Sequence, residues 1–290
     1  MQSKLSIITS DNRAIKQNSL NSLKYYDLSF YINSAYCLNH GYQFSYFRMI
    51  DLTKNKNHLK KDTISSYCTK TKLTKSPPWT KLLVIYENFL KKNDYIVYLD
   101  SDCFFNNHKI NIQAIIKKLE LQKKFGLFFN DGPWHKNLPN CGFMIFKNCE
   151  FNRQLLREWW NTFTLYNHVH PYEQKVFQKM WLRNYQNIQN KFILKKTSLQ
   201  QSGPKKFLIH ITANQNNLRV IKMKNFIFKN LKFQKNYFKK FILKNQKNFY
   251  PRIAECKINK KLNYYDELII KLHQYITLNI IFFIKKLKTF

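Results

Sequence analysis

Acidic residues are scarce in this chain, which has 16 aspartates and glutamates against 50 lysines and arginines and a formal net charge of +34. So basic a protein is expected to meet a polyanionic neighbour, such as nucleic acid, an anionic membrane or a phosphate-bearing substrate. Charge alone does not choose among these classes. An AT-rich genome, whose codons favour Lys, Asn, Ile and Phe, is an alternative source of the excess.

The sequence also lacks the patterns of a secreted or disulfide-rich protein. Its six cysteines form no C-x-x-C pair and no metal-finger spacing, which indicates ordinary reduced thiols. The amino-terminal "MQSKLSIITSDNR" has no long apolar segment, and no asparagine lies in an N-x-Ser/Thr acceptor site. We therefore expect a cytoplasmic protein that is not secreted.

Long hydrophobic runs are missing as well. The longest late apolar run, "YITLNIIFFI" at 275–284, is about half of the roughly 20 residues that a membrane-spanning helix needs. We expect no transmembrane segment, although this run can lie on a membrane surface.

Strand-like and helix-like segments alternate along most of the chain. With 44% hydrophobic and 17% aromatic residues among 290, the chain can bury one large core, or a core plus an appendage. The alternation predicts an α/β domain around a mostly parallel sheet flanked by helices. The expected strands are 5–9, 42–50, 95–99, 125–129, 142–146, 192–194 and 207–211, and the expected helices are 19–40, 79–92, 151–164 and 172–183.

The composition changes near residue 220. No acidic residue occurs between Glu173 and Glu255, and residues 222–249 carry nine lysines interleaved with six phenylalanines. We therefore divide the chain into an α/β domain, 1–220, and a basic, aromatic-rich extension, 221–290. The extension is expected to attach to an anionic membrane through its lysines and phenylalanines.

Two aspartates stand out in this acid-poor chain. In "VYLDSDCFF" (97–105), Asp100 and Asp102 directly follow a continuous apolar strand. In open α/β sheets ligands bind beyond the carboxyl ends of the strands, so these carboxylates lie where a ligand is expected. Side chains two residues apart on an extended segment share a face, and two carboxylates so placed suit Mg²⁺ or Mn²⁺ and leave positions open for phosphate oxygens.

The stretch "PPWTKLLVIYENFLKKNDYIVYLDSDCFF" (77–105) resembles the central motif of retaining GT-A glycosyltransferases, in particular the galactosyl/xylosyl/mannosyl transferase family. Further similarities follow in the family's order, over roughly residues 4–215: "NSAYCLNHGYQFSYF", "NCGFMIFKN" with "LLREWW", "YEQKVF" and "FLIHI". The chain departs from the family at "TANQ" after the late histidine, in lacking an amino-terminal anchor, and in its basic tail. The resemblance implies a GT-A (Rossmann-like) fold.

The resemblance also implies roles for individual residues. Asp102 and His210 would bind the divalent cation, Mn²⁺ or Mg²⁺, and Asp100 would contact the metal or the nucleotide ribose. Lys81, at the W-x-K position, would approach the phosphates or the donor sugar. The cation would neutralise the leaving diphosphate.

Other positions would bind the nucleotide-sugar or act beside the reacting carbon. Thr9, Ser10 and Arg13 follow the first strand and would line the nucleotide pocket, with Ser101 of the D-S-D block. Glu173 and Gln174 would lie under the anomeric carbon. The donor and acceptor segment contains Asn140 and Gly142, where a small residue lets the backbone approach the sugar.

The main hypothesis is therefore a metal-dependent glycosyltransferase that moves a hexose or pentose from a UDP- or GDP-sugar to a glycan or glycolipid acceptor. Retention would follow from the family, by a front-face route, slightly favoured, or by double displacement with a side chain such as Glu173. The alternatives are a nucleic-acid-binding protein, for which no recognition motif is present, and a basic membrane-surface protein without catalysis.

Overall fold

The structure is a computed structural model of the chain and describes residues 4–16, 22–49, 67–68, 73–74, 77–91, 93–132, 135, 137–161, 170–198, 206–211, 216–230 and 246–249. The strands are β1 Leu5–Asp11, β2 Gln43–Met49, β3 Tyr67–Cys68, β4 Leu73–Thr74, β5 Tyr95–Leu99, β6 Cys103–Phe105, β7 Gly126–Asn130, β8 Pro139–Lys147, β9 Phe192–Ser198, β10 Leu208–His210 and β11 Gln246–Phe249. The α-helices are α1 Tyr25–Asn39, α2 Thr80–Phe89, α3 Ile112–Lys118, α4 Glu150–Asn161, α6 Glu173–Leu182, α7 Ile188–Lys191 and α8 Asn216–Asn230, and short 3₁₀ turns are η4 Pro77–Trp79, η5 Leu121–Lys123 and η6 Tyr185–Asn187.

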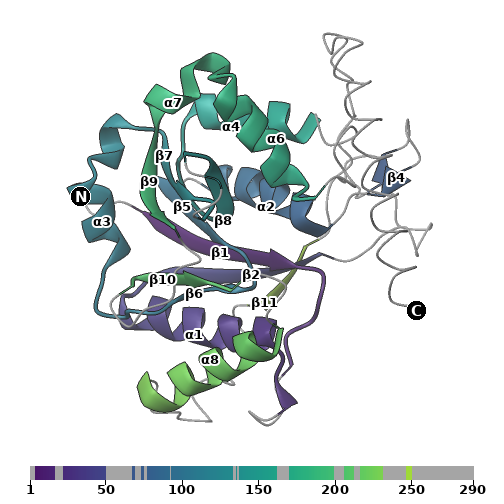
Figure 1. The fold of residues 1–290 in the computed structure, drawn as a ribbon, viewed down its shortest axis with the longest axis vertical. Coiled ribbons are helices and arrows are strands. Elements are labelled where there is room, and N and C mark those ends of the chain that lie inside the picture. Colours follow the sequence, from purple (N-terminus) through teal and green to yellow (C-terminus); the bar gives the residue numbers. More distant parts are fainter. Residues whose placement is uncertain are drawn as a thin grey trace, which may run out of the picture.

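A seven-stranded sheet in the order β11-β2-β1-β5-β8-β7-β9 forms the centre of the fold (Figure 1). The neighbours β11 and β2, β2 and β1, β1 and β5, and β7 and β9 run parallel, whereas β8 is antiparallel to both β5 and β7. The predicted mostly parallel sheet flanked by helices is confirmed. The reversed strand is β8, which the apolar pattern at 142–146 could not orient, because such a pattern marks burial on both faces and not direction.

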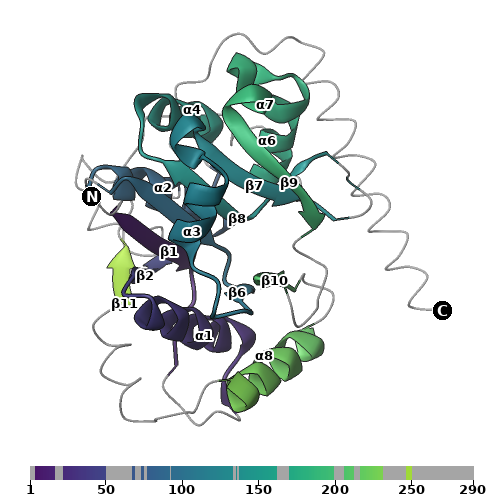
Figure 2. The same ribbon diagram turned by 90° about the vertical axis from the view of Figure 1, so that its left-hand side faces the viewer.

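The sheet has a core on each face. Successive residues of β1 point to opposite sides, so Ile7 packs in a cluster with α1 and α8, while Ile8 packs in one with α2, α4 and α6. Figures 1 and 2 show these two groups of helices on opposite faces of the sheet. All five residues of β5 are buried, as expected of a strand covered on both sides.

Local signals explain the ends of α1. Near its beginning, the Asp27 carboxylate accepts a hydrogen bond from the backbone N–H of Lys24, the N-cap residue, and another from that of Lys16, earlier in the chain. The helix ends before Gly41, which has a φ of 69°, a conformation that favours glycine. The helix begins at Tyr25 and not near residue 19 as expected, since residues 22–24 before it are not α-helical; residues 17–21 lie outside the described part.

Helix α8 crosses residue 220, the predicted domain boundary. Its Met223, Phe226 and Ile227 are buried in the cluster that contains α1. The start of the predicted extension therefore packs on the α/β domain, and Phe226 is not available to a membrane. Strand β11 joins the sheet edge beside β2.

The rest of the predicted extension, residues 231–245 and 250–290 with the apolar run 275–284, lies outside the described residues. The division of the chain into a domain and a separate extension stays a prediction. Among the helices that the structure describes, none is long and apolar enough to cross a membrane.

Candidate functional site

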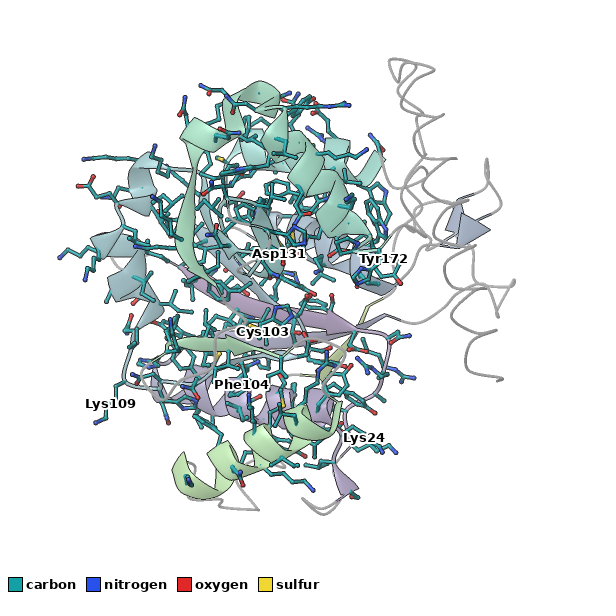
Figure 3. The ribbon with its side chains drawn as sticks, in the orientation of Figure 1. Lys24, Cys103, Phe104, Lys109, Asp131 and Tyr172 are labelled. Atoms are coloured by element: carbon teal, nitrogen blue, oxygen red, sulfur yellow. The ribbon has the colours of Figure 1, made fainter. Side chains whose placement is uncertain are left out.

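A cavity of about 610 Å³ lies where β1, β5 and β7 end at their carboxyl termini. This volume is within the range of about 300–1,000 Å³ typical of small-molecule pockets. Figure 3 draws the side chains and labels two that line this cavity, Asp131 and Tyr172. Its lining residues are Ser10, Asp11, Asn12, Arg13, Pro78, Lys81, Tyr98, Asp100, Ser101, Asp102, Asp131, His135, Asn140, His170, Pro171, Tyr172, Glu173, Gln174, His210 and Arg219.

Strand pairing brings the two aspartates and the late histidine together. Strand β6 follows Asp102 directly and pairs antiparallel with β10, so that His210 lies opposite Cys103. One potential ligand atom from each of Asp100, Asp102 and His210 lies within 4.8 Å of the others. His210 Nε2 lies 3.0 Å from Asp102 Oδ1. Asp100 and His210 are 110 positions apart in sequence, yet their ligand atoms are close enough in space for the cluster to hold one ion.

Two further observations fit a metal at this cluster. His210 is 9% exposed, and its Nδ1 is buried without a hydrogen-bond partner in the described part of the chain, so the ring makes polar contact only through Nε2. The residues that line the cavity also carry more negative than permanent positive charge, in a chain of net charge +34. The carboxylates are Asp11, Asp100, Asp102, Asp131 and Glu173, and the permanent cations are Arg13, Lys81 and Arg219.

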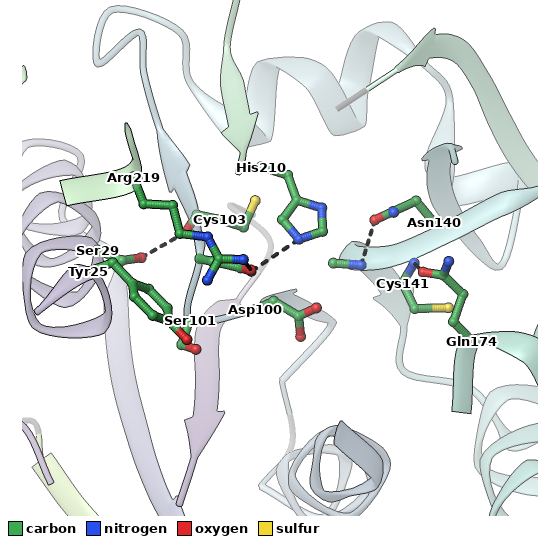
Figure 4. A network of polar contacts seen from close by, with 12 residues as sticks. Tyr25, Ser29, Asp100, Ser101, Cys103, Asn140, Cys141, Gln174, His210 and Arg219 are labelled. Carbon is green, nitrogen blue, oxygen red and sulfur yellow. Dashed lines mark hydrogen bonds and ion pairs between the residues drawn. The ribbon is translucent and has the colours of Figure 1, made fainter. Parts of the chain in front are cut away.

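Arg219 reaches the cluster from α8. Its guanidinium donates a hydrogen bond of 2.8 Å to Asp102 Oδ2, and it lies over the Tyr25 ring at 4.5 Å (Figure 4). Burial opposes ionisation of Asp102, but His210 and then Arg219 outweigh it and hold the pKa of the carboxyl below its usual value. Burial likewise lowers the pKa of His210, and the facing Asp102 more than reverses this and raises it.

Lys81 joins the cluster to Glu173. The ammonium of Lys81 lies 2.8 Å from Asp100 Oδ1 and 2.7 Å from Glu173 Oε1, and it donates to the Cys141 carbonyl at 3.2 Å. Burial lowers the pKa of Lys81, but the two carboxylates raise it well above its usual value. Burial raises the pKa of Glu173 although Lys81 acts in the opposite direction. A lysine has three N–H donors, so the donors of Lys81 are all used by protein groups.

On the side of the cluster where Ser101 lies (Figure 4), Arg13 also lines the cavity. Arg13 donates to Asp11 Oδ1 through Nε at 2.7 Å and to the Tyr25 hydroxyl at 2.8 Å, and it lies over the Tyr26 ring at 4.2 Å. Arg13 also donates to the Ser101 hydroxyl at 3.3 Å. A guanidinium fixed by a carboxylate and two aromatic rings is held ready for a flat or anionic ligand.

On the other side, the cavity is lined by Asp131, Asn140 and Gln174, whose polar groups are joined by hydrogen bonds. The Asp131 carboxylate accepts hydrogen bonds from the side-chain amides of Asn140, Gln174 and Gln178, at 2.8, 2.9 and 2.9 Å. Gln174 also accepts from the Cys141 backbone N–H at 2.8 Å. Such a cluster offers donors and acceptors to a ligand rich in hydroxyl groups.

Ten of the twelve residues that the sequence singled out line this cavity. Thr9 and Gly142 do not: Thr9 is buried in β1 one residue before the cavity, and Gly142 lies behind the His210 ring. Ser10 lines the cavity, and its hydroxyl forms hydrogen bonds of 3.1 Å with the hydroxyls of Thr80 and Tyr98. The catalytic and binding roles given to these residues stay predictions.

Sequence reasoning missed Asp11, Asp131 and Arg219. Asp11 and Asp131 each follow a predicted strand within two residues in an acid-poor chain, which is the signal that identified Asp100. That signal was available and could have found both. Arg219 had no comparable signal, because it is one of 50 basic residues and only the packing of α8 on α1 brings it to Asp102.

The chain was also compared with known proteins. No protein-family model matches it, and no curated protein does. Among solved structures it is similar to a glycosyltransferase involved in the glycosylation of the major capsid of PBCV-1, at 17% identity over 77% of this chain and 99% of that one, with a TM-score of 0.52.

Two lower-scoring structures are GlyE of Streptococcus pneumoniae TIGR4 and the catalytic domain of Drosophila beta1,4galactosyltransferase 7. Both share 11% identity with this chain. The GlyE match covers 87% of this chain and 65% of GlyE, with a TM-score of 0.47. The galactosyltransferase match covers 73% of this chain and 72% of that one, with a TM-score of 0.39. The fold assignment rests on the first similarity and on the sheet order. The chain has the GT-A, Rossmann-like fold.

Proposed function

We propose that this protein is a metal-dependent glycosyltransferase that moves a hexose or pentose from a UDP- or GDP-linked donor to a glycan or glycolipid acceptor. The observation that carries the proposal is the meeting of Asp100, Asp102 and His210 in the cavity at the carboxyl ends of the strands of this fold. The sequence resemblance to retaining GT-A enzymes agrees with it. Mn²⁺ or Mg²⁺ bound by these three residues would supply positive charge for the leaving diphosphate.

The two sides of the cavity suit the two parts of a nucleotide-sugar. We assign the nucleoside to the side with Ser10, Arg13 and Ser101, since Arg13 presents a fixed guanidinium between aromatic rings. We assign the sugar to the side with Asp131, Asn140 and Gln174, where fixed amides and a carboxylate can bond to hydroxyl groups. The Asp100–Asp102–His210 cluster lies between them, where the diphosphate would be.

The environment of Glu173 favours the front-face route over double displacement. A carboxylate nucleophile must present an accessible oxygen to the anomeric carbon. Glu173 is 3% exposed, and its Oε1 is paired with Lys81, which is itself 3% exposed. Its Oε2 has no hydrogen-bond partner among the described residues, but it is buried as well. In this proposal Glu173 serves as the counter-ion that orients Lys81, and Lys81 in turn holds Asp100 rather than a phosphate.

The test is hydrolysis or transfer from a panel of UDP- and GDP-sugars, with Mn²⁺, with Mg²⁺ and with chelator. We expect turnover of at least one donor only when a divalent cation is present, and release of the α-anomer from an α-linked donor, followed by proton NMR. Absence of turnover with every donor and a range of glycan and glycolipid acceptors would refute the proposal. A product of opposite configuration would refute retention alone.

A further inference from the structure

Both carboxylates of the proposed metal cluster are already paired with buried, permanently charged groups. Lys81 Nζ lies 2.8 Å from one oxygen of Asp100 and 3.1 Å from the other. Arg219 lies 2.8 Å from Asp102 Oδ2. The side chains of Lys81 and Arg219 are each 3% exposed, so water screens these charges little.

This pairing decides how strongly the cluster attracts a cation. The negative charge of Asp100 and Asp102 is matched by the positive charge of Lys81 and Arg219 in direct contact with them. Among the lining residues that the structure describes, Asp11 is paired with Arg13, so the excess negative charge comes from Glu173, which Lys81 also contacts, and from Asp131. A divalent cation that entered alone would therefore be repelled by two adjacent positive charges. The negative charge of a diphosphate that entered with it would offset this repulsion.

We propose that Arg219 and Lys81 keep the metal affinity of the free protein low, so that the divalent cation and the nucleoside diphosphate bind as a strongly coupled pair. The inference rests on the proposed function, since it takes Asp100, Asp102 and His210 to be the metal ligands. Coupling between two ligands is reciprocal, so the factor by which the nucleotide strengthens metal binding equals the factor by which the metal strengthens nucleotide binding.

Arg219 is the better residue to change. Loss of the Lys81 ammonium would leave Glu173 as well as Asp100 without a cation in a buried site. Arg219 pairs with Asp102 and packs on Tyr25 from α8 (Figure 4), so a long apolar side chain can keep the packing while it removes the charge. Arg219→Met does this, and Arg219→Lys keeps the charge.

The experiment is calorimetric titration of Mn²⁺ into the full-length protein, with and without UDP or GDP, corrected for binding of Mn²⁺ to nucleotide alone. We expect Arg219→Met to bind Mn²⁺ without nucleotide about tenfold more tightly than the wild type, because a positive charge beside the site is gone. The factor by which nucleotide strengthens Mn²⁺ binding should fall to the same extent. Arg219→Lys should stay near the wild type. Lys123→Met, at an exposed ion pair with Glu120, makes the same change in net charge away from the cavity and should leave Mn²⁺ binding unchanged.

The opposite outcome has a clear structural meaning. If Arg219→Met weakens Mn²⁺ binding or leaves it unchanged, Arg219 positions Asp102 as a ligand and does not restrain the site, and the inference is wrong while the metal site stands. If neither wild type nor variants bind Mn²⁺ in any combination with nucleotide, the metal site of the proposed function is wrong too. Thermal unfolding identifies a misfolded variant, in which case Arg219→Gln takes the place of Arg219→Met in the same titrations.

Discussion

The imidazole of His210 lies against Gly142: a Cβ at residue 142 would come within 2.5 Å of His210 Cε1 and 2.7 Å of Nδ1. The contact explains why a glycine stands in β8 at this place, although its own backbone conformation is ordinary. The N–H of Gly142 donates to Asn140 Oδ1 at 2.7 Å, so the strand is fixed here and the histidine must give way.

Gly142→Ala should therefore displace His210 and impair the proposed metal site. We expect Mn²⁺ affinity in the presence of UDP or GDP to fall at least about tenfold, and turnover about 100-fold, since a shift of about 1 Å in a site costs that much. Gly41→Ala is the control. Residue 41 has no heavy atom within 4 Å of a built Cβ but a φ of 69°, so this variant should lose about 1 kcal/mol of unfolding free energy and keep its Mn²⁺ affinity.

Asp102→Asn and His210→Ala should each lower turnover at least about 100-fold, because each removes one of the proposed ligands. Both residues border the cavity, so the folded state should persist, as judged by circular dichroism and thermal unfolding. Asp94→Asn, at an exposed aspartate that accepts from the Lys4 backbone N–H, should leave turnover unchanged. Near-normal turnover in either site variant would remove that residue from the ligand set.

Lys81→Met should destabilise the fold by about 3–5 kcal/mol in urea unfolding, because Asp100 and Glu173 would lose their shared buried cation. The double variant Lys81→Met/Glu173→Gln should recover part of this loss, since one of the two stranded charges is gone. The exposed pair of Lys123 and Glu120 gives the comparison: Lys123→Met should cost no more than about 1 kcal/mol. Equal effects of Lys81→Met and Lys123→Met would contradict the buried network.

His108 should make stability depend on pH. Burial, together with nearby His40, lowers the pKa of His108 from 6.5 to about 4. The unfolded chain binds more protons than the folded one between these values, so the contribution of His108 is fully present above about pH 6.5 and is lost as the pH falls toward 4. The His108 ring packs against Tyr36 and Phe226, so phenylalanine can replace it.

The measurement is urea unfolding of wild type and His108→Phe at pH 7 and pH 5. The wild type should lose on the order of 1–2 kcal/mol more than the variant over this interval. Parallel losses in the two proteins would show that His108 titrates alike in the folded and unfolded chains.

The effect of truncating the basic extension on folding and activity should depend on where the chain is cut. A cut after residue 220 removes the buried Met223, Phe226 and Ile227 of α8, at a cost of about 1.5–3 kcal/mol for each side chain, and should abolish folding or activity. A cut after residue 250 keeps α8 and β11 and should spare hydrolysis of the donor. If residues 251–290 attach the protein to anionic membranes, only the second truncation will give an active protein that no longer sediments with anionic vesicles at low salt. Salt-insensitive sedimentation of the full chain would instead argue against electrostatic attachment.

The sequence by itself determined the class of the fold and most of the candidate site. Apolar runs such as 95–99 mark buried strands whatever their neighbours are, and a polar pair at the end of such a run, Asp100 and Asp102, falls at the carboxyl edge of a sheet. Glycine at residue 41 ended α1 where the pattern indicated. These features are local, so spacing and residue type are enough to predict them.

Only the tertiary structure decided which distant residues meet. The antiparallel pairing of β6 and β10 places His210 beside Asp102, the reversal of β8 brings Gly142 against the histidine, and the packing of α8 on α1 carries Arg219 into the cluster. It also decided that Lys81 is a buried counter-ion of Glu173 and Asp100. A lysine on a helix and an arginine in a basic segment look the same in sequence whether they face solvent or a carboxylate, because their partners lie far along the chain and are chosen by how the elements pack.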